Sequence, residues 1–201
     1  PALGTGPVMD YLGQTGMAAL NGADAIKTAP QTYKSEVEYA GDPVALRLRD
    51  VAQVHLAGLG TRILYTELGG FDTHAAQATG HPKLWSQVSN AVSDFWDDLR
   101  QHDADDNVTM LIFSEFGRRV KENGGGTDHG AGGVAFVLGP GVTGGTYSEY
   151  PDIRAEALWD GDLAATQDFR GLYVSLLKDW LKIDPQAVIN GQYEKPEMFV
   201  S

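Results

Sequence analysis

Apolar side chains recur at helical spacing in three stretches of this chain. The first begins at Asp42 and Pro43, residue types that are typical of a helix N-cap and of the first helical position, and it continues to Gly58. The second covers residues 82–102, where the apolar positions form one stripe along the helix surface. The third covers residues 169–181. We therefore predict a helix in each of these stretches.

Three shorter runs are rich in apolar residues and end at glycine or at polar residues. They are residues 62–68, 107–113 and 133–138, and we expect each to form a buried strand. Strands that alternate with helices of this length predict an α/β fold, with a parallel or mixed sheet covered by helices on both faces. Residues 1–41 show only weak periodicity, so we expect irregular structure there, with a short helix near residues 10–20.

The composition fits one globular domain. The chain has 201 residues, of which 42% are hydrophobic, and this suffices for one sizeable core. We predict a single domain over residues 1–201, with the α/β core in residues 42–201. Because the chain begins at Pro1 without an initiator methionine, we interpret it as a processed chain or as a fragment that lacks its N-terminal part.

Charge and cysteine content exclude several classes of function. The net charge of -12 and the pI of about 4.6 imply an acidic surface that repels phosphate backbones, so we expect no nucleic-acid partner. The chain has no cysteine, which excludes disulfides, thiol catalysis and zinc–thiolate sites. No run approaches 18 consecutive apolar residues, so we expect no membrane span.

Acidic residues and histidines gather at the ends of the predicted strands. Because ligands of α/β sheets bind beyond the carboxyl ends of the strands, the strands at 62–68 and 107–113, together with the glycine-rich loop after them, would deliver these residues to one edge. Carboxylate and imidazole groups can hold one or two divalent ions, with zinc, manganese, iron and magnesium as the candidates. The predicted metal ligands are Asp72, His74, Glu115, Asp128 and His129.

Each of these residues also has a purely structural interpretation. Asp72 could cap a turn with His74 as its hydrogen-bonded neighbour, and Glu115 could form an ion pair with Arg118 or Arg119. The alternative role for Arg118 is to hold an anionic substrate. Only the combination of the motifs favours a site.

Five motifs in a fixed order resemble the DUF1501 family over roughly residues 61–199. The motifs are Gly69-Gly70-Phe71-Asp72-Thr73-His74, Ser114-Glu115-Phe116-Gly117-Arg118, Thr127-Asp128-His129-Gly130, Gly144-Gly145-Thr146-Tyr147 and Asp168-Phe169-Arg170. The resemblance implies membership of the alkaline-phosphatase-like superfamily, which includes sulfatases and phosphoglycerate mutases. It also implies a bacterial protein that is exported, often through a twin-arginine signal, to the periplasm or the extracellular space.

The same resemblance implies a fold and a ligand set. The fold would be a three-layer α/β sandwich with a metal site at the strand ends. Asp72 and His74 would match an Asp/His ligand pair, Glu115 would stand where relatives have an Asp, and His129 would match a late His ligand. The superfamily's first metal Asp and its Ser or Thr nucleophile have no counterpart in this sequence, so the missing N-terminal part or a partner chain would supply them.

These observations lead to two functional hypotheses. The first is an exported, metal-dependent hydrolase that acts on small phosphate or sulfate esters, with Arg118 in contact with the anionic substrate. The second is a non-catalytic exported protein with a structural or binding role that keeps an alkaline-phosphatase-like fold.

Overall fold

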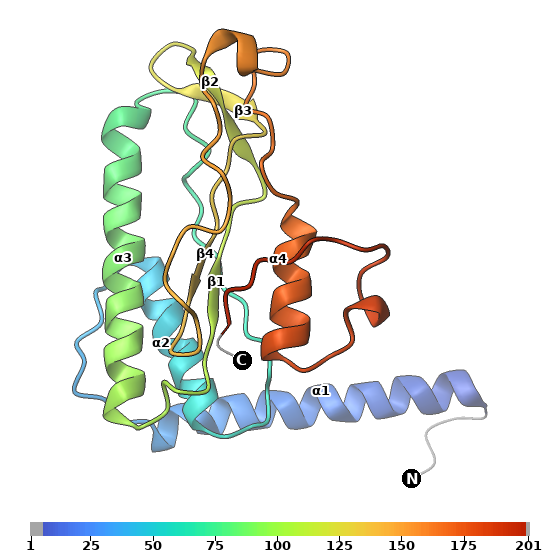
Figure 1. The fold of residues 1–201 in the computed structure, drawn as a ribbon. Coiled ribbons are helices and arrows are strands. Elements are labelled where there is room, and N and C mark those ends of the chain that lie inside the picture. Colours follow the sequence, from blue (N-terminus) through green and yellow to red (C-terminus); the bar gives the residue numbers. More distant parts are fainter. Residues whose placement is uncertain (1–5, 200–201) are drawn as a thin grey trace. The chain divides into compact units, whose positions relative to one another are not determined.

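The computed structural model describes residues 6–199. Within them the chain forms four α-helices, two short antiparallel strand pairs and several single turns of helix (Figure 1). Contacts divide it into two compact units, which are Pro1–Gly69 with Leu84–Ala104, and Gly70–Lys83 with Asp105–Ser201. The elements are α1 (Pro7–Thr32), α2 (Pro43–Leu56), α3 (Gln77–Gln101), β1 (Met110–Ile112), β2 (Gly117–Glu122), β3 (Thr127–Gly130), β4 (Phe136–Leu138), η1 (Ala155–Ala157), α4 (Phe169–Ser175), the π-helical η2 (Leu176–Trp180) and η3 (Pro185–Ala187).

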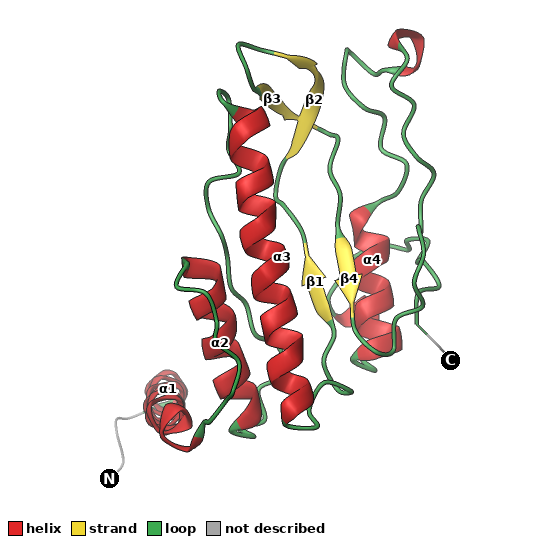
Figure 2. Ribbon diagram, turned by 90° about the vertical axis from the view of Figure 1, so that its left-hand side faces the viewer, coloured by secondary structure: helices red, strands yellow, loops and turns green. Residues whose placement is uncertain are grey.

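The first unit has its core between α2 and α3, which run alongside one another in both views (Figures 1 and 2). The α2 helix begins as predicted, because the Asp42 side chain accepts a hydrogen bond from the Ala45 amide at 3.1 Å. Part of the apolar stripe of each helix is buried, and Phe95 and Trp96 pack edge to face at 5.7 Å between ring centroids. The buried apolar residues of the two helices are Val44, Ala45, Leu48, Ala52, Ala91, Val92, Phe95, Trp96 and Leu99.

The second unit contains all four strands and α4. The β1 and β4 strands pair antiparallel, with Met110 opposite Leu138. The β2 and β3 strands form a hairpin in which Arg118 lies opposite His129 (Figure 2). The α4 helix begins at the predicted cap, where the Asp168 side chain accepts from the Arg170 amide.

The predicted three-layer α/β sandwich with a parallel or mixed sheet is wrong. Among the described residues there are only two sheets, each of two antiparallel strands. A parallel pair needs a crossover of about a dozen residues or more, usually a helix, whereas the chain between β1 and β4 folds into the β2–β3 hairpin. The stretch predicted as the first strand, residues 62–68, forms no strand, and its Ile63 and Tyr65 side chains are both 72% exposed. An apolar run predicts burial only where neighbouring strands exist to cover it.

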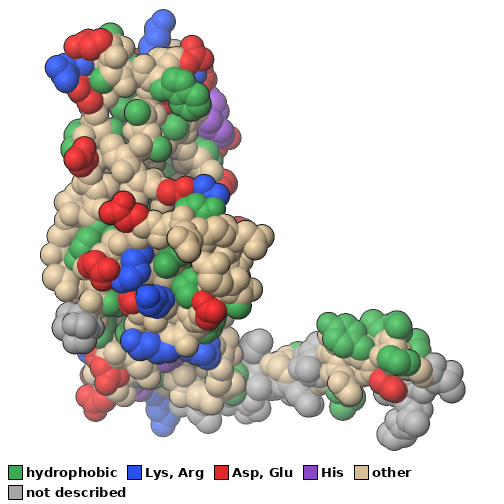
Figure 3. All heavy atoms as spheres, turned by 45° about the vertical axis from the view of Figure 1, so that its right-hand side comes forward, with side chains coloured by type: hydrophobic (Ala, Val, Ile, Leu, Met, Phe, Trp, Pro, Cys, Tyr) green, Lys and Arg blue, Asp and Glu red, His purple; other side chains and the backbone are tan. Residues whose placement is uncertain are grey.

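The N-terminal segment differs from the irregular structure that we expected over residues 1–41. The α1 helix starts with Pro7 at its first position and extends far beyond the expected short helix. Several large apolar side chains in its first half are exposed, among them Val8, Tyr11 and Leu12 (Figure 3). Residues 1–5 of this segment lie outside the described residues.

None of the helices in the described part of the chain is both long enough and apolar enough to cross a membrane. The assignment of all 201 residues to a single domain stays a prediction.

Candidate metal centre

Two chain segments of the second unit carry the candidate ligands. The first is the stretch around Asp72 and His74, which follows Gly70, whose φ of 100° is a backbone conformation that side chains disfavour. The second is β3, which carries His129. The hairpin turn approaches the first segment so closely that a Cβ atom on Gly126 would lie 2.4 Å from the carbonyl carbon of His74, so only glycine fits at that position.

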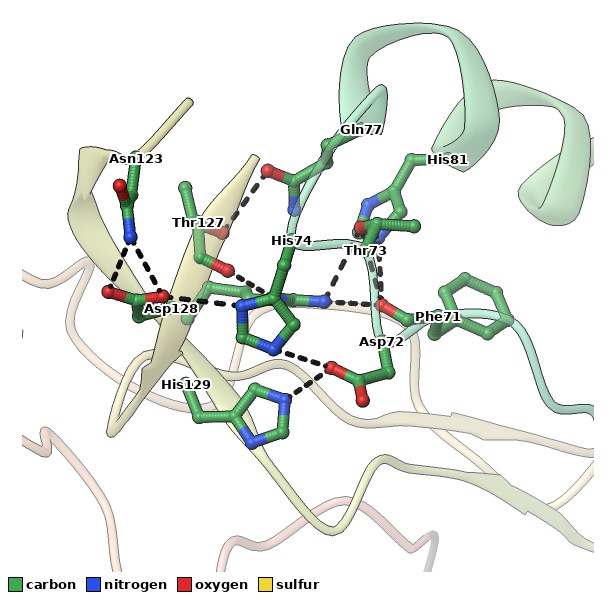
Figure 4. A network of polar contacts seen from close by, with 11 residues as sticks. Phe71, Asp72, Thr73, His74, Gln77, His81, Asn123, Thr127, Asp128 and His129 are labelled. Atoms are coloured by element: carbon green, nitrogen blue, oxygen red, sulfur yellow. Dashed lines mark hydrogen bonds and ion pairs between the residues drawn. The ribbon is translucent and has the colours of Figure 1, made fainter. Parts of the chain in front are cut away.

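Three side chains meet at one carboxylate oxygen. The Oδ1 atom of Asp72 lies 2.9 Å from Nε2 of His74 and 2.7 Å from Nε2 of His129 (Figure 4). The two imidazole rings have centroids 5.1 Å apart. All three side chains are well exposed, at 60% for Asp72, 50% for His74 and 46% for His129. Histidine side chains are accordingly visible on the molecular surface (Figure 3).

A second carboxylate fixes the orientation of His74. The Nδ1 atom of His74 lies 3.2 Å from Oδ1 of Asp128. Asp128 is itself held by the side-chain amide of Asn123, which donates to both carboxylate oxygens at 3.2 and 3.0 Å (Figure 4). With Nδ1 facing a carboxylate, the Nε2 atom of His74 is left to face Asp72.

The electrostatic environment favours the ionised form of Asp72. The hydrogen bond from His129 lowers the pKa of the Asp72 carboxyl below its usual range, and the charges of His129, His74 and Arg118 act in the same direction. Desolvation opposes this shift, but the hydrogen bond from His129 is the largest influence and the net pKa is lowered. Asp72 is therefore a carboxylate at neutral pH, the form that binds a metal ion.

Arg118 and His81 form hydrogen bonds with the segments that carry the candidate ligands. Arg118 donates hydrogen bonds to the backbone carbonyls of Phe71 and Thr127 and lies 3.4 Å from the hydroxyl of Thr73. The same hydroxyl lies 2.9 Å from Nε2 of His81.

The structure therefore separates the predicted site residues into groups. Asp72, His74 and His129 each offer a ligand atom within 4.8 Å of the others, and Asp128 stands behind His74 as its hydrogen-bond partner. Glu115 is exposed in the turn before β2 and does not belong to the group of described residues that could share an ion. Its predicted position depended on a central parallel strand that the chain does not form.

Arg118 was predicted to contact a substrate, but its guanidinium is occupied by backbone carbonyls. Sequence reasoning also missed Asn123, His81 and Phe116, which contact the cluster or its supports. Asn123 and His81 lie outside the five motifs, and Phe116 lies within one but carries no ligand atom, so their contacts follow only from the way the chain folds here. Only the glycine run before Thr127 indicated a turn in this place.

The DUF1501 family model, described as a protein of unknown function, matches residues 14–175, a range that includes the whole cluster. The chain belongs to the DUF1501 family. No curated protein and no solved structure matches it significantly.

Proposed function

We propose that this DUF1501 chain is a metal-dependent hydrolase-like protein in which Asp72, His74 and His129 hold one divalent ion. The observation that carries the proposal is the meeting of two Nε2 atoms at a single carboxylate oxygen. Two imidazoles and one carboxylate are the protein ligands of many catalytic zinc sites, which keep a further position open, and of non-haem iron sites. Of the candidate metals, zinc and iron suit the two imidazole nitrogens better than magnesium, which prefers oxygen ligands.

The chemistry of the donor set fits such an ion. The three ligand atoms already lie within 4.8 Å of one another, so a small shift would allow all of them to reach one ion. Asp72 is ionised, and the carboxylate of Asp128 behind His74 gives the carboxylate–histidine arrangement that accompanies most metal-bound histidines. The exposure of the cluster leaves room for water and for a substrate.

The proposed substrates are small phosphate or sulfate esters. When bound, a divalent ion polarises an ester oxygen and lowers the pKa of bound water. The chain's own residues supply the geometry: Asp128 keeps His74 in one orientation, and Asn123 keeps Asp128 in place. The family resemblance supports this class of substrate and an exported location, periplasmic or extracellular. Detection of the native protein only in the cytoplasmic fraction would contradict the location.

A second candidate function is a non-catalytic exported protein with a structural or binding role. One observation favours it: the guanidinium of Arg118 donates to backbone carbonyls. In that case the metal would bind without ester hydrolysis.

Metal content and activity distinguish these functions. The native full-length protein should contain about one divalent ion per chain by elemental analysis, and it should hydrolyse p-nitrophenyl phosphate or p-nitrophenyl sulfate until a chelator is added. His129→Ala should weaken metal binding by about 10–100-fold. The control is His55→Ala, since His55 only approaches the carbonyl of Ala104, at 3.3 Å. Metal-bound but inactive protein would support the binding role, and metal-free protein would contradict the site.

A further inference from the structure

The start of β2 contacts both segments that carry the proposed ligands. We propose that Phe116 and Arg118 are positioning residues, which fix the separation and orientation of Asp72 and His129 without touching the ion themselves. This inference rests on the proposed metal site. It gives the motif Ser114-Glu115-Phe116-Gly117-Arg118 a role different from the one that its sequence suggested, which was a ligand at Glu115 and a substrate contact at Arg118.

Arg118 joins the two ligand-bearing segments through its guanidinium. One terminal nitrogen donates to the carbonyl of Phe71, which directly precedes Asp72, and the other donates to the carbonyl of Thr127, two residues before His129. A planar guanidinium makes both bonds in a fixed relative geometry, whereas the single ammonium group of lysine cannot reproduce this fork. The length of Arg118 therefore sets the distance between the two segments.

Phe116 controls the ring of His129. The two rings are stacked, with centroids 4.1 Å apart and planes only 11° from parallel. The guanidinium carbon of Arg118 lies 5.1 Å from the centroid of the Phe116 ring, a cation–π contact that holds this phenyl ring in turn. A stacked ring restricts the rotation of the imidazole, so its Nε2 atom stays directed at Asp72.

Gly117, between Phe116 and Arg118, allows the start of β2 to lie close to the chain that follows β3. A Cβ atom on Gly117 would lie 2.4 Å from the carbonyl oxygen of Gly132 and 2.6 Å from that of Gly130. The Arg118 amide also donates to the Gly132 carbonyl at 2.6 Å. The backbone that carries Phe116 and Arg118 is therefore held in place. Their side chains can then position the proposed ligands.

The chain offers a matched control for each positioning residue. Arg119 is the neighbour of Arg118 on the same strand, but its guanidinium reaches only the carbonyl of Asp160, at 3.4 Å. Phe113 follows β1 and is 48% exposed. Arg118→Lys is therefore compared with Arg119→Lys, and Phe116→Leu with Phe113→Leu.

The experiment measures binding of Zn²⁺ and the visible absorption spectrum of bound Co²⁺ in the full-length chain. Arg118→Lys and Phe116→Leu should each weaken Zn²⁺ binding by about 10-fold or more, as loss of an outer-shell partner does, and should change the Co²⁺ bands, which report ligand geometry. The two control variants should bind like the wild type. Phe116→Tyr keeps the stacked ring and should restore both measurements.

The outcomes separate this inference from the function on which it rests. A wild-type chain that binds neither ion would refute the metal site itself. A wild-type chain that binds Zn²⁺, together with unchanged affinity and unchanged Co²⁺ spectra in Phe116→Leu, would overturn only the positioning role. If Arg118→Lys does not fold, as judged by circular dichroism, the Phe116 pair of variants decides the question.

Discussion

Two aspartates in this chain each gather hydrogen-bond donors around one carboxylate oxygen, one at the surface and one in a core. In the second unit, Oδ1 of Asp72 faces two imidazoles, and its side chain is 60% exposed. In the first unit, Oδ2 of Asp98 accepts hydrogen bonds from the hydroxyls of Tyr33 at 2.5 Å and Tyr39 at 2.8 Å, and Asp98 is completely buried. The difference between them shows how burial and the type of hydrogen-bond donor decide whether a carboxylate suits a structural role or metal binding.

The donors around Asp98 are groups that remain protonated. Burial and the hydrogen bond to Asp98 raise the pKa of Tyr33 to about 12, and the same causes raise the pKa of Tyr39 further. The ring nitrogens of His102 each lie 2.8 Å from a backbone carbonyl, that of Asp98 and that of Lys34, and the contact with the Asp98 carbonyl is the main cause of the raised pKa of His102. With two phenol donors that keep their protons, the network around Asp98 has a structural role.

The donors around Asp72 are imidazoles, which become metal ligands once they lose a proton. Water reaches the cluster, and no phenol competes for the carboxylate among the contacts of the described residues. The same residue types, Asp and His, thus form a structural clamp in one unit and a candidate metal centre in the other.

The largest expected effect is on the hydrogen-bond network around the buried carboxylate of Asp98. Asp98→Ala removes a fully buried carboxylate that accepts from two partly buried tyrosine hydroxyls, and a hydrogen bond to a charged group contributes about 1.5–3 kcal/mol, so the free energy of unfolding should fall by about 3 kcal/mol. Urea denaturation measures this loss. Asp97→Ala is the matched control, because Asp97 forms only an exposed pair with Arg100 and should change stability by about 0.5 kcal/mol or less. Equal losses of stability in the two variants would contradict the structural role of Asp98.

At the exposed cluster of Asp72, His74 and His129, a substitution should reduce metal affinity rather than stability. Asp72→Ala should leave the free energy of unfolding of the metal-free chain essentially at the wild-type value, because the side chain is exposed. It should weaken Zn²⁺ binding by about 100-fold, since the central ligand is lost. Isothermal titration calorimetry and urea denaturation of the same preparations test both parts. A large loss of stability with unchanged metal affinity would make Asp72 a structural residue instead.

The helices α2 and α3 could largely be predicted from the sequence because their signals are local, whereas most of α1 was not, since its segment shows only weak periodicity. Periodicity and the cap at Asp42 determine α2, and the apolar stripe of residues 82–102 determines most of α3. The sheet could not be predicted in this way, because strand pairing depends on which segments meet. The apolar run at 62–68 carried a strand pattern, and the hairpin that did form, β2 with β3, has little apolar character.

The candidate site shows the same limit. We expected Asp72 and His129 to meet at the edge of a parallel sheet, but the structure brings them together through a hairpin that folds onto the Asp72 segment. Residue type and adjacent glycines pointed to Asp72, His74 and His129 as candidate ligands, and the structure places these three side chains together. They gave no indication of the contacts that Arg118 makes with the carbonyls of Phe71 and Thr127, or of the hydrogen bonds from Asn123 to Asp128, because both depend on the hairpin.

The smallest expected effect is on the stability of the Asp98 network at alkaline pH. Tyr33 has a pKa of about 12 in the folded chain, against about 10 in an unfolded one, so the folded state disfavours its ionisation. The stability from this raised pKa is fully present below pH 10 and is lost as the pH rises through about 12. Tyr33→Phe should lower the free energy of unfolding by about 1 kcal/mol at neutral pH, the usual loss for one hydrogen bond, and should make the decline above pH 10 shallower. Urea denaturation at several pH values, with Tyr150→Phe as the control because that ring is 88% exposed, measures both quantities. The same slope above pH 10 in Tyr33→Phe and in the wild type would show that Tyr33 ionises normally in the folded chain, and Asp98 would then lose its role as the acceptor that keeps this hydroxyl protonated.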